Sequence, residues 1–150
     1  MSADELTIHE RITIQMEYAV PLVRDLQRIL GEGVVDAALE ERVRRDVARA
    51  EEGATAEANL SLLAAATARY AAGDALEYEI LASDDERFDM NVTRCAYQEM
   101  MERMGARDIG HLLICNLDFP MAIRAGLELE RTQTRMQGAS HCDFRYRKRR

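Results

Sequence analysis

The residues best suited to chemistry lie in the last third of the chain. All three cysteines and two of the three histidines fall between Cys95 and Cys142, the others being His111, Cys115 and His141. Thiolate and imidazole groups serve as metal ligands and in nucleophilic catalysis. The pattern therefore allows three interpretations: a metal site, a cysteine nucleophile with its helpers, or a scatter of small buried residues.

The spacing gives only partial support to a metal site. His111 and Cys115 are four residues apart on an expected helix and would share a face, as two ligands of one ion must. His141 and Cys142 are adjacent, and neighbours on a strand face opposite sides. No CxxC or HxxxH pair occurs, although structural zinc sites usually carry such spacing. We expect no bound metal and no cofactor.

A nucleophilic site needs a thiolate, a group that handles its proton, and donors for developing negative charge. Cys142 is followed by Asp143 and Arg145, and a nearby arginine favours the thiolate. Asp118 stands three positions after Cys115, near an expected helix end from which a carboxylate could reach a cleft. The competing interpretation is that Cys142 and Cys115 are buried small apolar residues, as most unpaired cysteines are.

An ordered set of short motifs bears on this choice. The chain carries R-C at Arg94-Cys95, C-x-x-D from Cys115 to Asp118, and G-x-x-x-C-D-F-R from Gly138 to Arg145. Each motif alone is weak. Together, at these separations, they resemble the L-2-amino-thiazoline-4-carboxylic acid hydrolase family. The resemblance covers roughly the last sixty residues well and the helical first half only in general character.

The resemblance implies an α+β fold and a cytoplasmic hydrolase that opens a C–N bond in a small heterocycle by cysteine chemistry. A thiolate attacks an amidine-like carbon readily, and an acid must then protonate the departing nitrogen. The implied catalytic residues are Cys142 as nucleophile, Cys115 as its rival and Asp118 as acid/base. His141 lies outside the motif and is a candidate because a histidine is the usual partner of a catalytic cysteine. The implied substrate-binding residues are Arg145 and Arg94, which could hold a carboxylate, and Cys95, which is also a possible nucleophile.

A second function remains open from the sequence. The chain could be a non-catalytic small-molecule-binding or assembly module with the same fold. Rapid labelling by iodoacetamide near neutral pH separates the two, because a catalytic thiolate reacts quickly and a core cysteine does not.

Composition limits the class of protein and its partners. The 150 residues suit one domain, 1–150, with a helical part over 1–73 and a mixed part over 74–150. A net charge of −7 argues against a nucleic-acid partner. There is no apolar run of the roughly 20 residues that a membrane span needs, and three cysteines do not form a secreted disulfide framework. We expect a cytoplasmic protein with a small-molecule substrate, no membrane partner, and the option of forming a homo-oligomer.

Periodicity predicts the elements that must position these residues. Apolar residues three or four apart predict a helix over 4–30, with a kink or a break at Pro21, and a second helix over 34–51. An Ala-rich helix over 55–72 follows. From Leu76 the period becomes two, and two alternating runs joined by a polar turn predict a hairpin whose Tyr78 and Ile80 share a core with Phe88, Met90 and Val92.

Shorter elements are expected in the remainder of the chain. The sequence predicts helices over 95–104 and 106–117, the second ending near Pro120. Two further strands are expected, over 127–136 and around Cys142, where Phe144 and Tyr146 share the Cys142 face. N-terminal helices packed on one face of a small antiparallel sheet satisfy the whole pattern.

Overall fold

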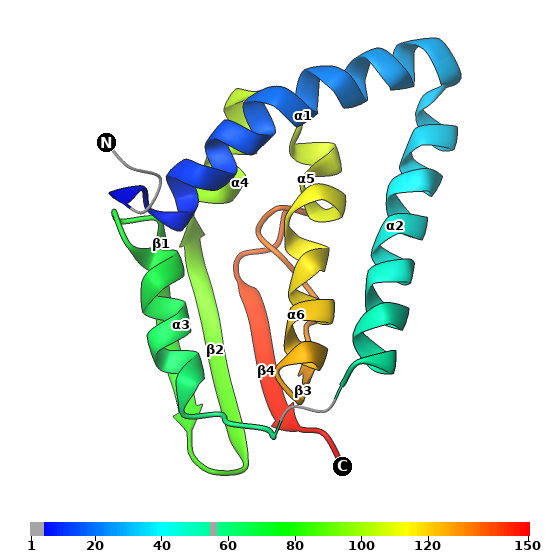
Figure 1. The fold of residues 1–150 in the computed structure, drawn as a ribbon. Helices are drawn as coiled ribbons and strands as arrows, with labels where there is room; N and C mark the ends of the chain where they lie inside the picture. Colours follow the sequence, from blue (N-terminus) through cyan, green and yellow to red (C-terminus); the bar gives the residue numbers. More distant parts are fainter. Residues whose placement is uncertain (1–4, 55–56) are drawn as a thin grey trace.

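Helices occupy the first half of the chain, and strands alternate with shorter helices in the second (Figure 1). The structure is a computed structural model that describes residues 5–54 and 57–150. In chain order its elements are α1 (Ile8–Leu30), α2 (Glu32–Glu52), α3 (Leu62–Ala71), β1 (Leu76–Ser83), β2 (Arg87–Cys95), α4 (Ala96–Arg103), α5 (Arg107–Leu113), the 3₁₀ turn η2 (Cys115–Leu117), α6 (Asp118–Arg124), β3 (Leu127–Glu130) and β4 (Cys142–Lys148).

The four strands form one antiparallel sheet in the order β1-β2-β4-β3. The predicted hairpin is confirmed: β1 pairs with β2 across a turn in which Asp84 accepts hydrogen bonds from the amides of Glu86 and Arg87. β4 lies between β2 and β3, and in its register Cys142 is opposite Val92. The final strand therefore brings Cys142 close to the end of β2.

One face of the sheet is apolar and covered. The predicted shared face of Cys142, Phe144 and Tyr146 is confirmed, because all three belong to one core cluster. The same cluster contains Phe88, Met90 and Val92 from β2 and Leu127 from β3, with Ala122 of α6 and Leu60 packed against them. Buried apolar side chains on three strands thus form the floor on which the helices lie.

The expectation for Ile80 is wrong, although Tyr78 does pack against the core as predicted. The Ile80 side chain is 41% exposed. The β1–β2 pairing shifts register between Glu77 and Tyr78 and again between Ile80 and Ala82, so the strict two-residue alternation fails along β1.

The helices cover the apolar face in two groups. α3 contacts β1 and α6 contacts β3, so these two helices lie directly over the sheet (Figure 1). α2 packs against α5 and α6, and α1 crosses α4, forming a second core of Met16, Val20 and Val23 from α1 with Met100 and Met101 from α4 and Ile109 from α5. The expected α+β class, with N-terminal helices on one face of a small antiparallel sheet, is confirmed.

The sequence suggested that two prolines interrupt helices, but both lie within helices in the structure. α1 continues through Pro21 to Leu30, so the alternative of two helices meeting there is wrong. Its end is at Gly31, whose φ of 94° is a backbone conformation that glycine adopts without strain. Pro120 lies in the first turn of α6, where an amide has no helical partner to lose, so a helix runs past the residue expected to end one.

Three other predicted boundaries differ from the structure. The helix expected over 106–117 ends at Leu113, because Ile114 leaves the helical backbone at φ −126° and η2 follows. The strand expected over 127–136 is only Leu127–Glu130. The Ala-rich helix expected over 55–72 is Leu62–Ala71, and residue 4 and residues 55–56 of the expected helices lie outside the described residues. Within residues 5–54 and 57–150, no helix is both long and apolar enough to cross a bilayer.

Candidate active site

A cavity of about 270 Å³ lies between the apolar face of the sheet and helices α3 and α6. We call it the thiol cavity, because all three cysteines line it. Its walls are mostly apolar and include Leu63, Ala66, Leu76, Met90, Val92, Ile114, Met121, Ala122, Leu127 and Phe144. Asp118 and Arg131 are its charged lining residues, and Tyr70, Tyr97 and Tyr146 also line it. An apolar cavity with few polar groups is typical of a small-molecule site.

Four different elements bring the reactive groups to this cavity. Cys95 is the last residue of β2 and Cys142 the first of β4, and these neighbouring strands place both thiols at one end of the sheet. Cys115 begins η2, and Asp118 begins α6 directly afterwards. The break at Ile114 turns the chain so that C-x-x-D follows the cavity wall rather than one straight helix. Residues 47 positions apart in the sequence thus share one small space.

The charged pair Arg131–Asp118 is the polar centre of the cavity. Arg131 Nη1 lies 2.6 Å from Asp118 Oδ2 and also donates to the carbonyl of Cys115 at 3.0 Å. The guanidinium lies 4.9 Å from the ring centroid of Phe119 and 5.3 Å from that of Phe144. The Arg131 side chain is 3% exposed and that of Asp118 is 29% exposed. The guanidinium is therefore fixed between two rings, while the carboxyl keeps an open side.

Sequence reasoning missed Arg131. It follows β3 without any motif, and no spacing links it to Asp118, 13 residues earlier. The one available clue is the alternation of Leu127 and Leu129 with glutamates, which puts Arg131 at the next apolar-face position. The clue is weak, because charged residues already make up the other half of this short run.

Burial controls the acidity of the thiols. It raises the pKa of Cys95 to about 11, against the opposing effect of backbone amides at the start of α4, and it raises the pKa of Cys115 further. Burial also raises the pKa of Cys142, but the amide of Arg135, 3.2 Å from its Sγ, and the charges of Arg131 and Arg135 act in the opposite direction. The charge of Asp118 adds to the effect of burial, so the pKa of Cys142 stays above its usual value, and the backbone donor and the two cations reduce the rise.

Asp118 has an altered acidity of the kind that suits proton transfer. Burial raises the pKa of its carboxyl to about 6, despite the opposing effects of the charge and hydrogen bond of Arg131. A carboxyl that titrates near neutral pH can both accept and donate a proton under physiological conditions. A group of this kind in a cavity lined by thiols is a candidate acid/base.

A sequence model of the L-2-amino-thiazoline-4-carboxylic acid hydrolase family matches residues 9–146 of this chain. The chain belongs to that family. The match extends over the helical first half as well as the motif-bearing second half, and the family name describes a hydrolase that acts on a thiazoline carboxylate. No curated protein matches the chain.

The two arginines expected to hold a substrate carboxylate lie outside the lining of the thiol cavity. Arg94 donates to the carbonyl of Asp74 at 2.8 Å and to Glu99 at 3.0 Å. Arg145 donates to the carbonyl of Met90 at 2.9 Å and to Asn91 at 3.0 Å. Both side chains are engaged away from the thiols, because successive residues on a strand point to opposite faces. Arg131 is the arginine in the described lining of the thiol cavity, and a substrate-binding role for Arg94 and Arg145 stays a prediction.

Neither candidate histidine lines the thiol cavity. His141 lies beside Ser140 Oγ at 2.9 Å and the Gln133 side chain. His111 borders a shallow depression with Arg107 and Met136, and its Nδ1 is buried without a hydrogen-bond partner in the described structure. The expectation that His141 assists the nucleophile finds no support in this position.

The residues considered as zinc ligands do not lie together: the three cysteines line the thiol cavity, His111 borders the shallow depression, and His141 lies beside Ser140. His111 and Cys115 do not continue one helix, since α5 ends at Leu113. In the described ranges, no group of three or more His, Cys, Asp or Glu side chains has an arrangement that could hold a metal ion.

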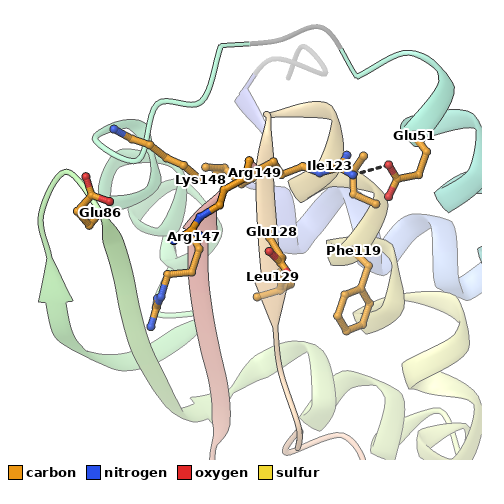
Figure 2. Close-up of a pocket in the computed structure, with 11 residues that line it drawn as sticks. Glu51, Glu86, Phe119, Ile123, Glu128, Leu129, Arg147, Lys148 and Arg149 are labelled. Carbon is orange, nitrogen blue, oxygen red and sulfur yellow. Dashed lines mark hydrogen bonds and ion pairs between the residues drawn. The ribbon is translucent and has the colours of Figure 1, made fainter.

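A larger hollow of about 690 Å³ opens beside the ends of β3 and β4 (Figure 2). Charged side chains from the end of β4 and from α2 border it, and Arg149 forms an ion pair with Glu51 across it. Phe119 and Ile123 of α6 form part of its wall. Its described lining contains no thiol, so we place the candidate active site in the smaller thiol cavity.

Proposed function

We propose that this protein is a cysteine-dependent hydrolase that opens a small sulfur- and nitrogen-containing ring, with a thiazoline carboxylate as the substrate class. The observation that carries the proposal is the convergence of Cys142, Asp118 and Arg131 on one apolar cavity. Pockets for drug-sized ligands occupy roughly 300–1,000 Å³, so a cavity of about 270 Å³ suits a smaller molecule.

Cys142 is the proposed nucleophile. Its amide donor from Arg135 and the nearby positive charges favour the thiolate, whereas Cys95 and Cys115 are more strongly held as thiols. The Asp118 carboxylate accepts the Cys142 proton as Sγ bonds to the C=N carbon, and the π electrons move to the ring nitrogen. Arg131 donates to one carboxylate oxygen of Asp118, Oδ2, so the other oxygen, Oδ1, accepts the proton.

The remaining steps return the enzyme to its starting state. The ring nitrogen takes the proton from Asp118. The exocyclic amino group then gives a proton to the Asp118 carboxylate while its electrons form a new C=N bond, the ring C–N bond breaks, and the departing nitrogen takes this second proton from Asp118. If the ring C–S bond breaks instead, the electrons on the ring nitrogen re-form the C=N bond and the departing sulfur takes the single proton from Asp118. The substrate is then bound through its carbon to Cys142. Water attacks this carbon with Asp118 as base, and Cys142 leaves as the thiolate and recovers its proton. The net reaction adds one water molecule.

Arg131 is the proposed anchor for the substrate carboxylate, in place of Arg94 and Arg145. It is the cation in the cavity lining, and its Nη2, which donates to Asn116 Oδ1 over a long 3.3 Å, is the nitrogen that the proposal leaves for the substrate carboxylate. Phe144 and Phe119 hold its plane, so the orientation of the fork is fixed before the substrate arrives.

Incubation with 2-amino-thiazoline-4-carboxylate tests the proposal. Loss of the ring, read by NMR, together with an acid-trapped adduct on the Cys142 peptide, read by mass spectrometry, is the expected result. The product also identifies the bond: C–N cleavage, expected from the sequence, gives a free amine, whereas C–S cleavage gives a free thiol that Ellman's reagent detects. Binding without turnover would contradict the proposal and favour the small-molecule-binding alternative.

A further inference from the structure

The outer side of α1 carries apolar side chains that nothing in the described structure covers. Ile14, Tyr18, Leu22, Leu26 and Ile29 are each between 39% and 76% exposed. They are spaced by four, four, four and three residues, so they form one continuous row on the helix. We call this row the outer stripe. The opposite side of α1 is also apolar and packs into the helical core.

A helix that is apolar on two sides is normally buried on both. α1 lies along the outside of the molecule, with α4 and α5 on its inner side (Figure 1). Leu30 and Val34, at the corner between α1 and α2, extend the exposed area. If a fully exposed large side chain presents roughly 200 Å², these seven residues expose on the order of 800 Å². That is more than the ~300–600 Å² of the largest patch on a typical monomer.

We propose that a second copy of this chain covers the outer stripe, with the two α1 helices antiparallel and related by a twofold axis near Val20. Standard interfaces bury about 800 Å² on each partner, which the exposed area matches. About residue 20 the stripe is self-complementary: Ile14 of one copy lies opposite Leu26 of the other, and Tyr18 lies opposite Leu22. A twofold interface requires this kind of self-matching surface.

The charges beside the stripe support the antiparallel direction. One flank carries Glu10 and Glu17 in its first half and Arg24 and Arg28 in its second half. Within the monomer, Arg24 also pairs with Asp108 of α5 and Arg28 with Asp25. A twofold axis brings this flank against the same flank of the partner in reverse order. Each acidic half then meets a basic half, whereas parallel helices would place like charges together.

The same charges argue against a membrane surface as the occupant. Helices that lie in a membrane interface carry mostly Lys and Arg on their polar face. Here the flank carries acids as well as bases, and the chain has a net charge of −7, which anionic lipids repel.

The test measures the mass of the full chain by sedimentation equilibrium from about 1 to 100 μM, because a dimer dissociates on dilution. The expected mass is twice 17.0 kDa. The double variant Tyr18→Glu, Leu22→Glu places acids opposite one another and should be monomeric with unchanged circular dichroism. Leu62→Glu, at an exposed apolar position on α3, is the control and should remain dimeric.

A cross-linking experiment tests the geometry without weakening the fold. A mixture of Ile14→Cys and Leu26→Cys chains should form a disulfide between the two kinds of chain under mild oxidation. Neither variant alone should form such a disulfide. In an antiparallel pair, the two copies of the same position, 14 or 26, are 12 residues apart, or about 18 Å along the helix. Wild type, with its three native thiols, reports the background.

Three results would overturn the proposal. They are a monomeric wild type across the whole concentration range, a dimer that persists in the double variant, or cross-linking within each single variant rather than in the mixture. A monomer that floats with phosphatidylglycerol vesicles would assign the stripe to a membrane surface instead.

Discussion

The two faces of β4 carry consecutive residues of one motif into different environments. Cys142 and Phe144 face the thiol cavity, whereas Asp143 and Arg145 lie on the other side of the strand. Asp143 accepts hydrogen bonds from the amides of Thr132 and Gln133, both at 2.9 Å, and so fixes the loop after β3.

Within the four residues from Cys142 to Arg145, one face of β4 carries the reactive groups and the other face positions a neighbouring segment. The inner face supplies the thiol and the ring against which Arg131 lies, and the outer face fixes the segment that carries Arg131. A motif shared by a family therefore does not assign its charged members to the substrate. Substitutions on the inner face should change turnover, and substitutions on the outer face should change stability.

The largest expected effect is at Cys142. Cys142→Ser keeps the size of the side chain but replaces the thiol with a far weaker nucleophile, so kcat should fall on the order of 10⁴-fold or more. Cys95→Ser and Cys115→Ser line the same cavity and are the matched controls, expected to retain turnover within about tenfold. Steady-state kinetics on the three variants checks this. Loss of turnover in a control alone would move the nucleophile to that residue.

Asp118→Asn should lower kcat by about 10²- to 10⁴-fold, the usual contribution of a positioned acid or base. The change keeps the shape and the hydrogen bond acceptor for Arg131 while removing the titratable group. A retained rate with a lowered melting temperature would show that Asp118 only anchors Arg131.

The pH dependence tests the same carboxyl in the unmodified protein. Because the proposed base must be ionised before it can accept the thiol proton, kcat/KM should rise with pH through about 6 and then level off. The limb should disappear from the residual activity of Asp118→Asn. A limb that stays in the variant belongs to another group.

A smaller effect is expected from the substrate anchor. Arg131→Lys keeps the charge but loses the planar fork, so KM should rise about 10- to 100-fold with a lesser change in kcat. Arg145→Lys on the outer face is the control and should leave KM within about twofold. Equal effects of the two changes on KM would remove the distinction between the faces.

The smallest effect on turnover is expected from Asp143→Ala. The amides of Thr132 and Gln133 would lose their acceptor, which should lower the free energy of unfolding by about 1–2 kcal/mol. Turnover should change by less than about threefold at temperatures where the variant is folded, since Asp143 does not line the cavity. Urea denaturation and kinetics on one preparation measure both quantities. A loss of turnover with full stability would assign Asp143 to the site.

Local periodicity determined much of the fold. The two-residue alternation of Tyr78 with its neighbours and of Phe88, Met90 and Val92 predicted the hairpin, and the Cys142–Tyr146 alternation predicted which side of β4 is buried. These patterns are readable because burial on one face imposes the period of the element itself. Ile80 is an exception, since register shifts depend on the partner strand.

Four of the residues predicted for the site also lie together, and an ordered set of motifs had singled them out. Cys95, Cys115, Asp118 and Cys142 all line one cavity. Only the tertiary structure brought Arg131 to Asp118 and removed Arg94, Arg145 and His141 from the cavity. The insertion of β4 between β2 and β3 decides which residues meet, and long-range strand pairing leaves no periodic trace in the amino-acid sequence.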